Sequence, residues 1–225
     1  MSGWRKTFSV ALLIAVVSGC STQVSVQDPR IPDPLISALP LSIGVRYPQS
    51  FDHFVHEEQV IGKEKWQIDL GASNKMLFNK LFNAMFTDVT LVAESADPAT
   101  LGLDALIEPS IDAFEFSVPE QSQTDSFAVW IRYRIKIFDR NGTQIENWPI
   151  SAYGKSQTST FGGDAALRRA AVLAMRDAAA LIIMQMDKST GISKLVNIEN
   201  DNAIPATGEP AVQHTAVEEQ GDDAL

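Results

Sequence analysis

Cysteine, histidine and positive charge are all scarce in this chain. Its 225 residues include one cysteine and three histidines, and 18 lysines and arginines stand against 28 aspartates and glutamates, for a net charge of −10. A single cysteine excludes an intramolecular disulfide framework and a zinc site built from several thiolates. The acidic balance is the opposite of the basic footprint that nucleic-acid binding needs, so we exclude that class of function.

Long apolar runs are scarce as well. The clearest one extends from Phe8 to Val17, which is shorter than the roughly 20 residues that span a bilayer. Arg5 and Lys6 precede this run, and small residues follow it. A basic start, an apolar stretch and small residues before a cleavage point are typical of a secretory signal peptide. We therefore predict that residues 1–19 are a signal peptide rather than a transmembrane helix.

The end of this segment, Val17-Ser18-Gly19-Cys20, resembles a bacterial lipobox. The resemblance implies cleavage before Cys20 and attachment of acyl chains, palmitate among them, to its thiol and new amino terminus. Bacterial lipoproteins of this kind carry three chains, which anchor stably where one chain would not. An aspartate after the cysteine often retains such proteins in the inner membrane, so Ser21 implies the outer membrane, facing the periplasm. A plain signal peptide with an incidental cysteine is the alternative.

Composition divides the rest of the chain into three regions. Residues 20–40 hold four prolines, and we expect a lipidated cysteine followed by an extended tether, up to roughly 65–70 Å long. Residues 41–196 have the apolar periodicity of a folded periplasmic domain. Residues 197–225 carry seven acidic residues and no lysine or arginine. This last region is predicted to be a disordered tail.

The periodicity of residues 41–196 predicts both strands and helices. A slip of phase near Ala113 predicts a β-bulge, Asn141-Gly142 predicts a hairpin turn, and Pro149 suits an edge strand or a bulge. The strand–helix order is β-α-β-β-β-β-α, which predicts an α+β fold with a mainly antiparallel sheet and both helices packed on one face. The predicted strands are 42–47, 89–92, 103–118, 127–138 and 144–158, with a short extra strand at 66–68, and the predicted helices are 74–86 and 165–187.

Three stretches carry a family resemblance: Asp104–Ile111, Tyr133–Gly142 with Trp148 after it, and Ala170–Ala179. Together they resemble the periplasmic lipoprotein domains of the curli-secretion lipoprotein, the outer-membrane activator of a penicillin-binding protein and the Pel-export lipoprotein. The lipopolysaccharide-transport lipoprotein is a looser likeness. The resemblance covers most of residues 41–190 and rests on element order and strand patterns. It implies a non-catalytic protein that acts through protein partners in the cell envelope.

Residues that could carry chemistry are few. His53 and His56 lie close in sequence, but their spacing does not match a helical metal-binding pair, and we expect a solvated loop. The carboxylates Asp104, Glu108 and Asp112 line one strand face, where we expect them to be solvated. Gly162-Gly163 before a helix is expected to break the chain rather than bind an anion, because Asp164 would repel one. The sequence thus predicts no metal site, no cofactor and no enzymatic activity.

One strand face is the best candidate for an interaction. Trp130, Arg132, Arg134 and Lys136 alternate with apolar residues and share the face opposite to the core. This face is either a polar surface that keeps the sheet hydrated or a docking site for an acidic partner or glycan, with Trp130 as an anchor. The leading hypothesis is a lipid-anchored accessory protein that binds or positions an envelope assembly or export complex. The alternatives are a carrier or chaperone for lipid or polysaccharide and, with least support, an envelope hydrolase.

Overall fold

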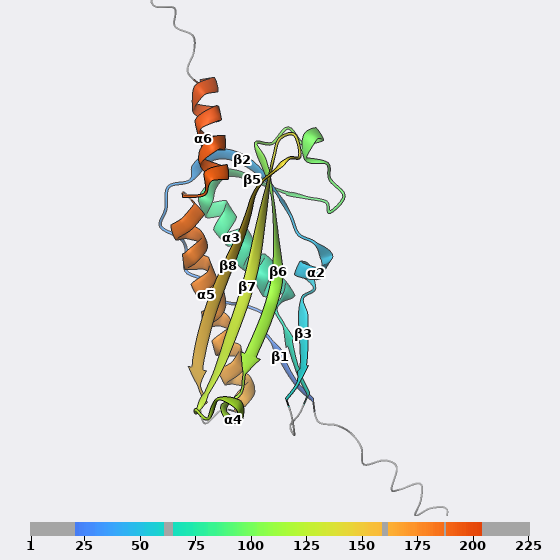
Figure 1. Cartoon of the computed structure of the whole chain (residues 1–225), viewed down its shortest axis with the longest axis vertical. Coiled ribbons are helices and arrows are strands. Elements are labelled where there is room, and N and C mark those ends of the chain that lie inside the picture. The colour runs from blue at the N-terminus through green and yellow to red at the C-terminus, as the bar shows by residue number, and fades with distance from the viewer. Residues whose placement is uncertain (1–20, 61–64, 159–161, 187, 204–225) are drawn as a thin grey trace, which may run out of the picture.

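A computed structural model describes residues 21–60, 65–158, 162–186 and 188–203. The predicted signal peptide and Cys20 lie outside these residues. The described chain is an α+β fold with two sheets and helices packed against them (Figure 1). Its elements are β1 Ser21–Ser25, β2 Leu39–Arg46, α2 Gln49–Asp52, β3 Val55–Gln59, β4 Lys65–Asp69, α3 Gly71–Met85, β5 Phe86–Val92, a 3-10 turn Pro98–Thr100, β6 Ala105–Ser117, α4 Pro119–Ser122, β7 Ser126–Asp139, β8 Gln144–Gln157, α5 Gly163–Met186 and α6 Thr190–Ala203.

The main sheet has five strands in the order β5-β2-β6-β7-β8. The long strands β6, β7 and β8 pair antiparallel, as predicted. The shorter strand β2 pairs parallel with both β5 and β6, so the sheet is mixed. Helix α3 returns the chain before β5, and a helical crossover of this kind is what parallel pairing requires. The predicted α+β class is confirmed, and the parallel pairs add to the expected antiparallel core.

Local sequence features of the three long strands match the predictions closely. The register between β6 and β7 shifts between Ile111 and Ala113, which is the predicted bulge. The turn after β7 has Gly142 at a φ of 80°, and the Asp139 carboxylate accepts hydrogen bonds from two backbone amides of that turn. Pro149 lies in β8, the last strand of the sheet, where a missing backbone donor does not interrupt a ladder.

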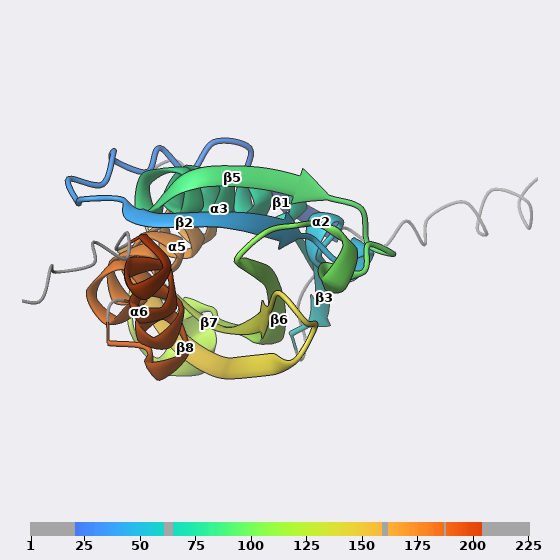
Figure 2. The ribbon, with the colours of Figure 1, turned by 90° about the horizontal axis from the view of Figure 1, so that it is seen from above.

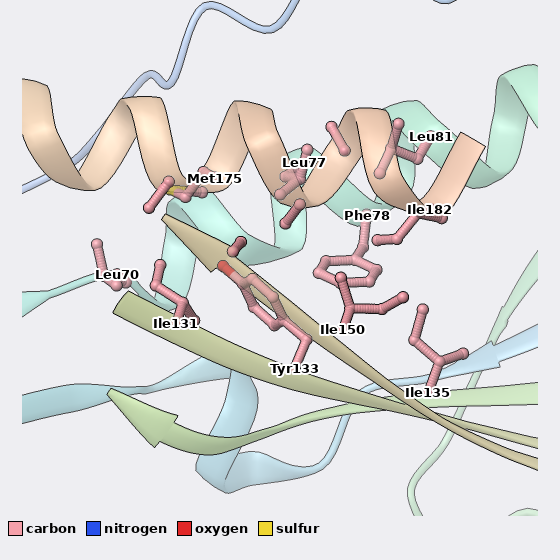
Figure 3. Packing of buried hydrophobic residues seen from close by; sticks show 14 of the residues in the cluster. Leu70, Leu77, Phe78, Leu81, Ile131, Tyr133, Ile135, Ile150, Met175 and Ile182 are labelled. Atoms are coloured by element: carbon pink, nitrogen blue, oxygen red, sulfur yellow. The ribbon is translucent and has the colours of Figure 1, made fainter. Parts of the chain in front are cut away.

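The core lies between the sheet and the two long helices. Both helices pack on the same face of the sheet, as predicted, and Figure 3 shows side chains of β7 and β8 pointing toward α3 and α5. Gly154 in β8 permits the closest approach, because a Cβ there would lie 2.1 Å from the Ala170 carbonyl oxygen of α5. The labelled core residues from the sheet are Ile131, Tyr133, Ile135 and Ile150, and those from the helices and the entry to α3 are Leu70, Leu77, Phe78, Leu81, Met175 and Ile182.

The region predicted as a tether, residues 20–40, is folded from Ser21 onward. Strand β1 pairs parallel with β4, in a second sheet of order β1-β4-β3. Val24 and Val26 are 1% and 2% exposed, and Ile31 is also buried. The four prolines favour an extended chain, but two valines at strand spacing provide enough apolar surface to attach this segment to the core. The tether prediction is therefore corrected for the described residues 21–40.

The other end of the domain also extends beyond its predicted limit. Helix α6 runs from Thr190 to Ala203 and so continues past residue 196, into the region predicted as a disordered tail. Ile192 and Leu195 are buried and fix the first turns of this helix. Figure 2 shows α6 beside α5, and α6 contacts both β2 and β8. Residues 204–225 of the predicted tail lie outside the described residues.

Candidate functional site

The candidate site is the outer face of β6, β7 and β8, defined as the side turned away from α3 and α5. Neighbouring residues form rows across the three strands on this face. The structure places the four predicted residues together on this face, as their alternation required. The rows are Glu115–Trp130–Tyr153, Ala113–Arg132–Ser151, Ser110–Arg134–Pro149 and Glu108–Lys136–Asn147.

Two of the four predicted residues are held by carboxylates of β6. Arg134 donates hydrogen bonds to both oxygens of Asp112 and to Asn147 Oδ1. These bonds hold the pKa of the Asp112 carboxyl below its usual range, and they raise the pKa of Arg134. Lys136 lies 3.4 Å from Glu108. Both cations therefore have partners within the chain, and their contacts link β7 to its neighbouring strands.

The carboxylates that were expected to be solvated form a series of ion pairs instead. Asp104 pairs with Arg140 at 2.9 Å, and Glu108 pairs with Arg46 at 2.8 Å in addition to Lys136. A strand face that brings opposite charges side by side favours such pairs. The sequence prediction treated each strand alone and could not place the partners across the sheet.

Among the predicted cations Arg132, Arg134 and Lys136, Arg132 takes no part in these ion pairs. The β-bulge sets Ala113, not a carboxylate, opposite Arg132. The Arg132 side chain is exposed, and it makes no hydrogen bond or ion pair with any residue that the structure describes. Its charge contributes to the lowered pKa of the Asp112 carboxyl, yet Arg134 occupies that carboxylate. The guanidinium is therefore available to a ligand from outside the chain.

Two exposed aromatic rings stand beside Arg132. Trp130 and Tyr153 are 44% and 43% exposed, and their ring centroids are 5.1 Å apart. A shallow pocket of about 280 Å³ lies at Trp130 and Arg132, and its other lining residues are Ala113, Glu115, Ile131, Ser151 and Ala152. Tyr153 was missed from the sequence, although counting equal steps outward from the Asn141-Gly142 turn places it opposite Trp130.

His53 and His56, the two histidines within the described residues, do not come together in a metal site. His53 lines a separate pocket of about 700 Å³ beside Asp52 and Lys75. His56 lies on β3, not in the expected loop, where it contacts the Phe114 ring and approaches Glu58 at 3.3 Å. Across the described residues, no group of three or more histidine, cysteine, aspartate or glutamate side chains is arranged to hold a metal ion. Within the same residues, no helix is long and apolar enough to cross a membrane.

Comparisons with known proteins give structural likenesses alone. No family model matches the chain, and no curated protein matches it. The chain resembles the solved structure of uncharacterised lipoprotein B of Nitrosomonas europaea with 13% sequence identity and a TM-score of 0.40, over 73% of this chain and 97% of that one. It resembles a hypothetical protein of Chlamydia trachomatis with 11% identity and a TM-score of 0.40, over 66% of this chain and 96% of that one. It resembles a minor lipoprotein of Acinetobacter baumannii with 14% identity and a TM-score of 0.35, over 65% of this chain and 92% of that one. Because each TM-score is below 0.5, these likenesses carry no conclusion about this chain. The resemblance to the curli-secretion group is not confirmed by them.

Proposed function

We propose that this protein is a lipoprotein anchored through Cys20 to the periplasmic face of the outer membrane, where it docks a protein of an envelope assembly or export complex without catalysing a reaction. The observation that carries the docking role is the cluster of Trp130, Tyr153 and Arg132, which we call the docking cluster. The anchor rests on the lipobox-like sequence that ends at Cys20.

The chemistry of the docking cluster fits a protein partner. Tryptophan, tyrosine and arginine are the residue types most enriched among the residues that dominate interface energies. The rings supply apolar area beside a shallow pocket, and Arg132 supplies a planar donor for a carboxylate. The partner surface that fits is therefore an apolar side chain flanked by an aspartate or glutamate.

The packing of the core bears on the alternative of a lipid or polysaccharide carrier. That alternative needed apolar space between the helices and the sheet. In the structure, Tyr133, Ile135, Phe78 and Met175 of this interface are all 0% exposed. The apolar pocket that Leu39, Met85 and Ile183 help to line has a volume of about 170 Å³, below the roughly 300 Å³ at which typical ligand pockets begin. The interface between helices and sheet thus favours the docking protein over the carrier.

The test uses a photo-crosslinking residue in place of Ser151, in intact cells that express the full-length protein. We expect one discrete adduct, which should be lost in Arg132→Glu. The control is Lys194→Glu, which makes the same charge reversal at an exposed position of α6 and should retain the adduct. A Cys20→Ser variant should leave the membrane fraction or accumulate as its precursor. The absence of a discrete adduct would show that the outer face is only a hydrated sheet surface, and an adduct that survives Arg132→Glu would refute the docking cluster as its cause. An acylated Cys20→Ser variant would refute the anchor.

A further inference from the structure

The distance between the anchor residue and the folded domain is very short. Cys20 is followed at once by Ser21, the first residue of β1, and one residue spans at most about 3.5 Å. Strand β1 is firmly attached to the domain: Val24 is 1% exposed, and Arg168 of α5 donates a hydrogen bond to the Ser25 carbonyl oxygen at 3.1 Å. An acyl anchor on Cys20, as the proposed function has it, would therefore leave no free arm between lipid and fold.

The elements beside the start of β1 define one end of the molecule, which we call the anchor end. Ser21 pairs with Lys65 at the start of β4, and Lys65 pairs with Gln59 at the end of β3. Thr22 lines a pocket of about 530 Å³ together with Pro119 of α4 and residues Gly163 and Asp164 at the start of α5. Figure 1 shows these elements at one end of the long axis, with α6 at the other.

We propose that the anchor end rests directly on the phospholipid headgroups and that the long axis of the domain stands away from the bilayer. This inference depends on the proposed acylation of Cys20. The occupant of the anchor end is a zwitterionic phospholipid surface, because two cations of this end face carboxylates of the chain itself: Lys65 lies 2.6 Å from Glu57, and Arg168 lies 3.9 Å from Asp164. The described residues of this end offer no cluster of unpaired cations for anionic lipid.

The proposed orientation sets the distance of the docking cluster from the membrane surface. Strand β7 starts at Ser126, beside α4, and runs toward the opposite end. Trp130 is four residues along the strand, or roughly 13 Å from the anchor end at a rise of about 3.3 Å per residue. Asp139, the last residue of β7, is roughly 43 Å away by the same measure, and Asn141 lies in the turn beyond it. A partner of Trp130 and Arg132 would meet this protein close to the membrane surface.

The test uses single cysteines, since the thiol of an acylated Cys20 is blocked and the chain holds no other cysteine. Thr124→Cys and Gln59→Cys report on the anchor end, and Asn141→Cys and Lys194→Cys are matched exposed positions at the opposite end. The acylated protein is placed in vesicles of phosphatidylethanolamine and phosphatidylcholine, which are both zwitterionic, with an energy acceptor on the headgroups. We expect energy transfer from the anchor-end probes to be about twofold higher or more, given the roughly 40 Å between the two ends.

A flexible insertion gives the internal control. About 20 serine and glycine residues between Cys20 and Ser21, starting with serine, would allow a separation of roughly 25 Å and should lower the transfer from Thr124→Cys toward that of Asn141→Cys. Equal transfer at both ends, in protein that floats with the vesicles, would overturn the orientation and leave the anchor intact. Protein that does not float and lacks acyl mass would overturn the proposed function itself.

Discussion

The two faces of β7 differ in the burial of their side chains and in the contacts that those side chains make. On the inner face, Ile131, Tyr133 and Ile135 are at most 1% exposed and contact the helices. On the outer face, Trp130 and Arg132 are exposed, and the stabilising contacts come from ion pairs with β6. Since side chains alternate along a strand, one segment serves both purposes. The inner face determines the packing of the domain, and the outer face has residues that packing does not need.

A change at Gly154 should give the largest effect and act through the inner face. In Gly154→Ala the new methyl group would meet backbone atoms of Ala170 and Ala174 at 2.1 and 2.4 Å, so α5 must move away from β8. We expect a loss of about 3 kcal/mol or more in unfolding free energy, measured by urea unfolding of the mature protein in detergent. Ser151→Ala, on the outer face of the same strand, should change it by less than about 0.5 kcal/mol. Similar losses for both variants would contradict the difference between the faces.

Tyr133→Phe should give the next largest effect. The Tyr133 hydroxyl donates a hydrogen bond to Asn74 Oδ1 at 2.7 Å, and both residues are 0% exposed. Burial raises the pKa of Tyr133, so the hydroxyl stays protonated and able to donate. Its removal leaves a buried oxygen without its partner, at a cost of about 1–3 kcal/mol.

The control for this change is Tyr153→Phe, on the outer face, where water replaces the lost hydroxyl contact. A second variant that also carries Asn74→Leu should recover part of the loss, since removing both polar partners is cheaper than removing one. A loss in Tyr153→Phe as large as in Tyr133→Phe would contradict the assignment of the hydrogen bond as a core contact.

The sequence was most informative where a pattern acts locally. The bulge near Ala113 follows from a change of phase within one strand, and the hairpin follows from Asn141-Gly142, so both were predictable. The fold of residues 21–26 was not, because β1 is stabilised by β4, about 40 residues away in the chain. The alternation within β7 was enough to predict that Arg132, Arg134 and Lys136 share one face. Only the register between β6 and β7, which are distant in sequence, shows that Arg132 lacks a carboxylate partner.

The ion pair of Asp112 should give the smallest effect, and one that depends on pH. The pKa of the Asp112 carboxyl is lowered in the folded protein, chiefly by its hydrogen bonds with Arg134. A lowered pKa means that the stabilisation by Asp112 is present at neutral pH. It is lost as the pH falls through the folded-state pKa, which lies below the usual aspartate value of about 3.9.

Asp112→Asn should therefore be slightly less stable than the parent protein at neutral pH, with a smaller loss than Tyr133→Phe. The difference from the parent should disappear in acid. Ser151→Ala changes no ionisable group on the same outer face, and its difference from the parent should stay nearly constant over the same range, as urea unfolding at a series of pH values would show. A gap for Asp112→Asn that persists below the folded-state pKa would mean that this carboxylate stabilises the strand pair by its shape and not by its charge.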